Sequence, residues 1–154
     1  MSKLFYQDIQ EIHCPEIYNL QKANVKDFGN NVWEKNEIIS LLRKKKIFGK
    51  VCLQNEELCG FCFFYIFQDF LELYTIFVNP IYRKAGIAGR FINFAVKFCK
   101  KNDIKSIVLE VNQENETAIR LYINHKFKPY SRRKNYYFIH GRHFDAISMR
   151  LEVI

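Results

Sequence analysis

The sequence lacks a long hydrophobic run, an internal repeat, a low-complexity segment and a long linker. Its longest apolar stretch, near Leu58 to Phe67, is too short to span a bilayer. The first twenty residues contain Asp8, Glu11 and Glu16 without a continuous apolar core, so a signal peptide is not expected there. We therefore expect residues 1–154 to form a single, cytoplasmic domain with no membrane partner.

Disulfides and metal sites are also not expected. Five cysteines are an odd number, and without a secretory context they indicate reduced thiols. The stretch Cys59-Gly60-Phe61-Cys62 has the Cys-x-x-Cys spacing of zinc and redox motifs, but it lies in an apparent strand, where residues three apart point to opposite faces. His140 and His143 lie in an expected loop without further ligands. The sequence therefore predicts no metal.

Two phosphate-binding motifs are missing. A P-loop requires Gly-Lys-Ser/Thr and a dinucleotide fingerprint requires Gly-x-Gly-x-x-Gly, and neither pattern is present. The net charge of +8 still favours an anionic partner, such as a phosphate-bearing cofactor or RNA. The basic runs Arg43–Lys46 and Arg132–Lys134 are short and typical of solvated edges. Direct nucleic-acid readout is therefore not expected.

Aromatic residues are abundant instead, and the hydrophobic pattern predicts about seven strands and about four helices. The 15 Phe and 9 Tyr indicate a core packed largely with rings. Short connections predict an antiparallel meander, and the later strand–helix–strand–helix alternation predicts an α+β domain with a mixed sheet. The expected strands are Leu4–Glu11, Ile47–Leu53, Leu58–Phe67, Leu71–Val78, Ser106–Val111, Lys128–Tyr137 and Asp145–Val153, and the expected helices are Pro15–Ala23, Glu34–Arg43, Gly86–Lys101 and one capped by Asn115.

The stretch from Leu71 to Lys101 combines a strand, a basic turn and a helix. Gly86 and its neighbours form the first helical turn, where backbone N–H groups lack intrahelical partners and the helix dipole is positive. Arg83, Lys84 and Arg90 add charge, and the small residues beside them leave the backbone accessible. This turn is predicted to bind a pyrophosphate. An ordinary strand-to-helix turn with solvated basic residues is the alternative.

Glu110 and Tyr122 are the candidates for proton transfer. Glu110 lies near the end of a buried strand, where desolvation would raise its pKa. Tyr122 lies about two turns beyond the Asn115 cap, and helical side chains lean toward the helix start, which directs its hydroxyl to the strand ends. A strand-edge Glu that caps nearby N–H groups and a Tyr that fills a helix face are the alternatives.

The basic turn also resembles a known family motif. Arg83-Lys84-Ala85-Gly86-Ile87-Ala88 is similar to the [Gln/Arg]-x-x-Gly-x-[Gly/Ala] acetyl-CoA loop of the GNAT superfamily of N-acetyltransferases, and it follows a strand and opens a helix as that family requires. The resemblance implies a GNAT fold and acetyl-CoA as co-substrate. The implied acetyl-CoA contacts are the backbone of Ile76, Phe77 and Val78, where a splay between strands receives the pantetheine arm, and Arg83, Lys84, Ala85, Gly86, Ile87 and Ala88.

A second stretch narrows the resemblance to the RimI-type ribosomal-protein alanine N-acetyltransferases. Leu109 to Tyr122 with Lys126-Phe127 looks like that group's "LEVR-x-x-N-x-x-A-I-x-LY-x-x-x-GF" segment. Its C-terminal "R-x-NYY…DA-x-x-M" signature is matched by Arg133 to Tyr137 and by Asp145-Ala146-x-x-Met149.

The resemblance implies a role for each matched residue. Glu110 is the proton acceptor, Tyr122 the proton donor to the CoA thiolate and Asn115 an acetyl-CoA contact. Tyr136 and Tyr137 match positions that line the groove for the N-terminal peptide. The segment Asn24–Trp33 is where a family member carries part of its acceptor-binding surface, although a core role for Trp33 is favoured.

Three departures leave the acceptor open. Phe77 replaces a usually small residue, Lys126 replaces a glycine, and the basic His140-Gly141-Arg142-His143 stands where an acidic loop is common. The leading hypothesis is acetylation of a protein N-terminus, with a ribosomal protein as acceptor. The alternatives are acetylation of a small amine, such as a polyamine or antibiotic, and a catalytically silent CoA-binding module. The paired tyrosines favour a peptide groove, while Glu110 and Tyr122 argue against silence.

Overall fold

The structure is a computed structural model that describes residues 3–28 and 32–154. In this part of the chain, one mixed sheet holds seven strands in the order β1-β2-β3-β4-β5-β7-β6. All neighbours are antiparallel except β4 and β5, so the predicted meander and mixed α+β sheet are confirmed. The strands are β1 (Phe5–Asp8), β2 (Ile47–Gln54), β3 (Glu57–Ile66), β4 (Phe70–Val78), β5 (Ser106–Asn112), β6 (Lys128–Ile139) and β7 (Arg142–Glu152).

Helices cover both faces of this sheet. The four predicted helices correspond to α1, α3, α4 and α5, and α2 adds one short turn. Among the described residues the helices are α1 (Cys14–Ala23), α2 (Val25–Phe28), α3 (Lys35–Arg43), α4 (Ile87–Lys101) and α5 (Glu116–Asn124), with 3₁₀ turns η1 (Glu11–His13) and η2 (Pro80–Tyr82). None of the helices in 3–28 and 32–154 has the length and hydropathy needed to cross a bilayer.

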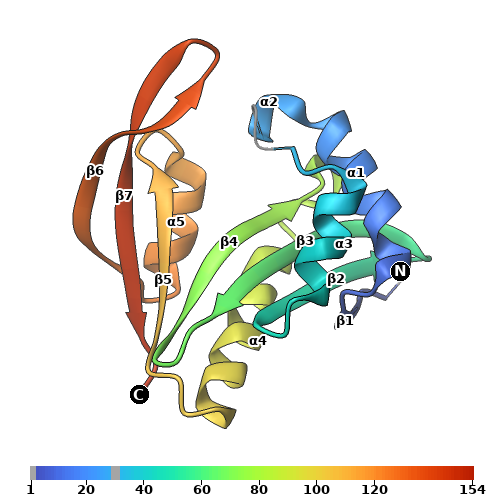
Figure 1. The fold of residues 1–154 in the computed structure, drawn as a ribbon, viewed down its shortest axis with the longest axis horizontal. Coiled ribbons are helices and arrows are strands. Elements are labelled where there is room, and N and C mark those ends of the chain that lie inside the picture. The colour runs from blue at the N-terminus through green and yellow to red at the C-terminus, as the bar shows by residue number, and fades with distance from the viewer. Residues whose placement is uncertain (1–2, 29–31) are drawn as a thin grey trace.

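The sheet opens between its two parallel strands. β4 and β5 pair only from Phe70↔Ser106 to Glu72↔Val108, and beyond these residues the strands separate. Figure 1 shows them running apart from a shared base, with β1 to β4 on one side and β5, β7 and β6 on the other. A bulge in β4 lies close to the start of the splay. Thr75 pairs with Phe63 and Leu73 with Phe64, which leaves Tyr74 as the extra residue.

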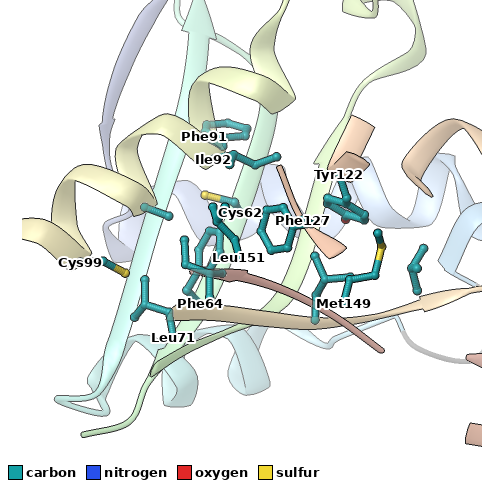
Figure 2. Close-up of a cluster of buried hydrophobic side chains, with 14 of the residues drawn as sticks. Cys62, Phe64, Leu71, Phe91, Ile92, Cys99, Tyr122, Phe127, Met149 and Leu151 are labelled. Carbon is teal, nitrogen blue, oxygen red and sulfur yellow. The ribbon is translucent and has the colours of Figure 1, made fainter. Parts of the chain in front are cut away.

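Two clusters of buried side chains hold the layers together. The larger packs α4 and α5 against one face of the sheet and includes Phe64, Phe91 and Met149 (Figure 2). The other packs α1 and α3 against the opposite face around Phe61 and Phe63. These four phenylalanines are at most 1% exposed, so the predicted ring-rich core is confirmed.

Two predicted boundaries were wrong. The first strand ends at Asp8 rather than at Glu11, because η1 takes over the chain there. The expected loop from Phe138 to Phe144 is a tight hairpin turn, since β6 continues to Ile139 and β7 begins at Arg142. His140 and Gly141 form the turn with φ of 50° and 76°, the left-handed pair that suits a two-residue hairpin.

The prediction that Cys59 and Cys62 face opposite sides was also wrong. Cys52 pairs with Gly60 and Leu53 with Leu58, so Cys59 is the extra residue of a bulge and packs in the same cluster as Cys62. Burial raises the pKa of the Cys52 thiol to about 11 and that of Cys62 to about 12. No group of three metal-ligating side chains occurs within the described ranges.

Candidate active site

The basic turn leads directly into α4. η2 follows β4, and Gly86 then caps α4 with φ of +78°. Arg90 N–H donates to Gly86 C=O, which leaves the N–H groups of Ile87, Ala88 and Gly89 without helical acceptors. The first turn of α4 holds no acidic residue. Because these N–H groups lie at the positive end of the helix dipole, the turn is suited to a phosphate.

Space at the turn fits the same ligand. A Cβ placed on Gly86 would meet none of the described atoms within 4 Å. Arg83, Lys84 and Ala85 are exposed, whereas the side chain of Ile87 belongs to the core, so Ile87 can offer only its backbone. The sequence-predicted positions therefore lie together at one helix terminus, and the residues fit a pyrophosphate.

Arg83 joins this turn to the end of β4. Its Nε donates to the carbonyl oxygen of Val78 at 3.1 Å, and its guanidinium lies 5.4 Å from the ring centroid of Phe77. The Phe77 ring also contacts Phe28, with 4.7 Å between centroids, in the cluster on the α1 and α3 side. The large residue that replaces a usually small one is thus accommodated by packing against α2.

The predicted pantetheine contacts lie on the open edge of β4. Ile76, Phe77 and Val78 pair with Cys62, Phe61 and Gly60 of β3, but they lie beyond the last residue that pairs with β5. Backbone groups on that edge are consequently available to an extended ligand. An inserted ligand arm could therefore take the place of a strand along β4.

Glu110 lies on β5 and is held by three contacts. Its Oε2 accepts a hydrogen bond from Ser148, its Oε1 lies 3.4 Å from Arg133 Nε, and its backbone carbonyl accepts from the Tyr137 hydroxyl at 3.0 Å. The side chain is 14% exposed. The neighbours Leu109 and Val111 enter the large core, so strand alternation places Glu110 on the opposite face of the sheet.

Tyr122 lies on the core side of β5. Its ring is 5% exposed and packs edge-to-face on Phe127 at 5.6 Å, near Met149 (Figure 2). No hydrogen bond to its hydroxyl occurs among the described residues. Burial, and secondarily Tyr137, raises the pKa of Tyr122, so the phenol stays protonated at neutral pH. A protonated phenol at this position on the core side of β5 is suited to donate.

The remaining predicted residues lie at the start of α5 and on β6. Asn115 caps α5, because its Oδ1 accepts from Ala118 N–H at 3.1 Å, and the predicted cap is thus confirmed. Tyr136 is 47% exposed and its ring lies edge-to-face on Tyr137, 5.0 Å away. Tyr137 therefore links the exposed tyrosine to the backbone of Glu110.

Part of the expected acceptor surface can be placed. Residues 29–31 of the segment Asn24–Trp33 lie outside the described residues. Trp33 packs on Phe63 with 5.4 Å between ring centroids, and its backbone bonds to the Gln21 side chain. The favoured core role of Trp33 is therefore confirmed.

A family model described as the acetyltransferase (GNAT) family matches residues 7–127. The chain belongs to the GNAT family of acetyltransferases. Members of this family use acetyl-CoA as the acetyl donor. The resemblance read from the basic turn is thus confirmed.

Two curated bacterial relatives match part of this GNAT chain in sequence. A Bacillus subtilis (strain 168) relative is 34% identical over 92 residues, 60% of either chain. The ribosomal protein bS18-alanine N-acetyltransferase of Escherichia coli (strain K12) is 29% identical over 100 residues, 65% of this chain and 68% of that protein. The matched segment therefore spans about two thirds or less of either relative.

Solved structures share the fold over nearly the whole chain. The Escherichia coli ribosomal-protein-S18-alanine N-acetyltransferase superposes with a TM-score of 0.84 and 22% identity over 98% of this chain and 94% of that one. Arabidopsis thaliana NAA60 in complex with acetyl-CoA superposes with a TM-score of 0.85 and 21% identity, over 97% of this chain and 98% of that one. An N-acetyltransferase from Staphylococcus aureus Mu50 superposes with a TM-score of 0.89 and 18% identity, over 99% of this chain and 100% of that one. At these identities the likeness shows the GNAT fold.

One charged residue of this GNAT site was missed by sequence reasoning. Glu72 is the last β4 residue that pairs with β5, opposite Val108 and therefore on the same face as Glu110. Burial and the nearby Glu110 raise the pKa of Glu72, while Arg133 lowers it. Glu72 forms no ion pair within the described part of the chain. The sequence feature that could have identified Glu72 was a lone carboxylate inside an otherwise apolar strand.

Proposed function

We propose that this GNAT acetyltransferase acetylates the N-terminal α-amine of a protein, with an N-terminal alanine of a ribosomal protein as the candidate acceptor. The hydrogen bond from Tyr137 to the backbone of Glu110 is the observation that carries the proposal. It brings the paired tyrosines, which match peptide-groove positions, next to the carboxylate that matches the proton acceptor. The partial likeness to bS18-alanine N-acetyltransferases supports the same acceptor class.

The acetyl donor is held by the helix terminus and the open strand edge. In this proposal the N–H groups at the start of α4 and the positions Arg83 to Ala88 bind the pyrophosphate, and the edge of β4 from Ile76 to Val78 binds the pantetheine arm. Asn115 contributes through the amide group that its capping oxygen leaves free. Acetyl-CoA, when bound, supplies the activated acetyl group.

The proton roles fall to two side chains on opposite faces of β5. The Glu110 carboxylate takes the proton that the acceptor nitrogen loses as its new bond to carbon forms, directly or through water. The Tyr122 hydroxyl gives a proton to the leaving sulfur as the carbon–sulfur bond breaks. Glu110 gains one proton and Tyr122 loses one in each turnover. Proton exchange with solvent therefore restores both side chains without another reactant.

A peptide assay tests the acceptor class. An α-amine has a pKa of about 7.7–8.0 and Lys about 10.4, so at neutral pH about a tenth of the former is neutral against well under a thousandth of the latter. We expect an alanine-starting peptide to be acetylated about two decades faster than the same peptide with a blocked N-terminus and one internal Lys. Mass spectrometry of the products and thiol release measure both rates, with spermidine as a third acceptor. Turnover of Lys or spermidine without turnover of the free N-terminus would refute the proposal.

A further inference from the structure

The carboxylate of Glu110 is held by two donors of different kinds. Ser148 and Glu110 are cross-strand partners in β7 and β5, and the serine hydroxyl donates to Oε2. The guanidinium of Arg133, on β6, faces the other oxygen, Oε1. The two carboxylate oxygens are therefore not equivalent.

The donors differ in how firmly they are held. Ser148 is 1% exposed, whereas the side chain of Arg133 is 58% exposed. Charge-assisted N–H···O bonds usually span about 2.7–2.9 Å, so the 3.4 Å between Arg133 and Oε1 is a loose contact. An incoming amine can displace this exposed guanidinium from Oε1. Ser148 cannot leave Oε2 without burying an unpaired hydroxyl.

The other charged and titratable groups around Glu110 act from separate elements. Glu72 on β4 has its pKa raised by burial and by the nearby Glu110, and Arg133 on β6 lowers the pKa of Glu72 and contacts Glu110. The Tyr137 hydroxyl, also on β6, bonds to the Glu110 backbone and not to its carboxylate. Ser148 is thus the neutral donor that acts on the carboxylate itself.

We propose that Ser148 is a positioning residue for acetyl transfer, whose hydroxyl holds Oε2 of Glu110 and leaves Oε1 free to accept the proton of the acceptor amine. The inference rests on the proposed function, in which Glu110 takes that proton. It adds a residue from β7 whose role neither the turn motif nor the paired tyrosines assign.

The chain offers a matched control for removing this hydroxyl. Ser106 is also fully buried in the sheet, but its Oγ has no hydrogen-bond partner in the described structure. Ser148→Ala should lower kcat/KM for the acceptor peptide roughly 10-fold at neutral pH and move the ascending limb of its pH profile up by about one unit, the size of a lost bond to a charged group. Ser148→Thr should retain the wild-type profile, and Ser106→Ala should change nothing.

A measurement without an acceptor separates this inference from the proposed function. The carboxyl ¹³C signal of Glu110, assigned with Glu110→Gln, is titrated in wild type and in Ser148→Ala, with circular dichroism and acetyl-CoA calorimetry as folding checks. An upward move of the titration midpoint supports the positioning role. An unmoved midpoint in folded Ser148→Ala, or an equal effect of Ser106→Ala, overturns it. Failure of wild type to acetylate any N-terminal peptide overturns the proposed function alone.

Discussion

Among single residues, Tyr122 and Glu110 lie in different environments on opposite faces of β5. Tyr122 is enclosed by the core and its hydroxyl has no partner among the described residues, while Glu110 has a donor for each carboxylate oxygen. Burial raises the pKa of Tyr122, so the phenol carries its proton at neutral pH. An ion pair and a hydrogen bond stabilise the carboxylate that accepts a proton. The environments therefore agree with the division of proton roles that we propose.

Removing the Tyr122 hydroxyl should affect turnover more than binding. Tyr122→Phe keeps the ring that packs on Phe127 and loses only the hydroxyl group. We expect kcat to fall by roughly 10²–10⁴-fold, while the Michaelis constant for acetyl-CoA stays nearly unchanged. Steady-state thiol release measures both. Tyr130→Phe, which removes an exposed phenol hydroxyl on β6, should behave as wild type. A near-normal kcat for Tyr122→Phe would leave this residue with a packing role only.

Glu110→Gln should produce a pH-dependent loss. Without its carboxylate the enzyme depends on amines that are already neutral, so activity should be lowest at low pH and recover as the pH passes the α-amine value of about 8. Thiol release from about pH 6 to about pH 10 with one N-terminal peptide spans the reference amine values. An equal loss at every pH would show that Glu110 orients other groups and accepts no proton.

At the scale of elements, the turn before α4 and the hairpin turn between β6 and β7 share a backbone feature but differ in surroundings. Gly86 and Gly141 have φ of 78° and 76°, and neither would bring a Cβ within 4 Å of a described atom. Only Gly86 precedes the free N–H groups of a helix N-terminus. Local conformation is thus alike at the two turns, and the helix that follows Gly86 is what suits that turn to an anion.

This pair of glycines gives a controlled test of the acetyl-CoA turn. Gly86→Asp places a carboxylate where phosphate charge is expected and should abolish acetyl-CoA binding in a folded protein. Gly141→Asp carries the same backbone strain and the same change of charge, so it should bind acetyl-CoA as wild type does. Calorimetry provides the comparison. Equal affinities in the two variants would remove the turn from the binding site.

At the scale of the whole molecule, the separation of β4 from β5 depends on packing against one face of the sheet. β4 and β5 share only the short pairing from Phe70 to Glu72. The larger buried cluster joins Phe64 and Leu71, from the part of the sheet formed by β1 to β4, to Leu109 and Met149, from the part formed by β5, β7 and β6. Figure 2 shows Met149 and Leu151 close to Tyr122 and Phe127 in this cluster. The core therefore connects the two parts of the sheet on either side of the opening between β4 and β5.

Met149→Ala should weaken this connection. Met149 is fully buried, and truncating such a side chain costs about 2–5 kcal/mol of unfolding free energy because a cavity remains. Urea unfolding followed by circular dichroism measures the loss. Ile12→Ala removes an apolar side chain that is 76% exposed and should change stability by about 0.5 kcal/mol or less. Similar midpoints for the two variants would contradict a core role for Met149.

The sequence by itself determined what depends on neighbouring residues. The helices, the meander and the glycine turn before α4 follow from periodicity, from short connections and from Gly86, and each was found in the structure. Anion binding by that turn stays a prediction. The hairpin at His140 was missed because the β6 and β7 residues that reach it are largely exposed and carry no hydrophobic alternation.

Only the tertiary structure decided which distant residues meet. Glu110 lies 23 positions from Arg133 and 38 from Ser148, and sheet order alone makes them neighbours. Glu72 joins them because the parallel pairing of β4 and β5 ends at that residue. The bulge that turns Cys59 toward Cys62 likewise depends on the register with β2. Strand pairing links segments far apart in the chain, and neither residue type nor local spacing encodes where that pairing stops.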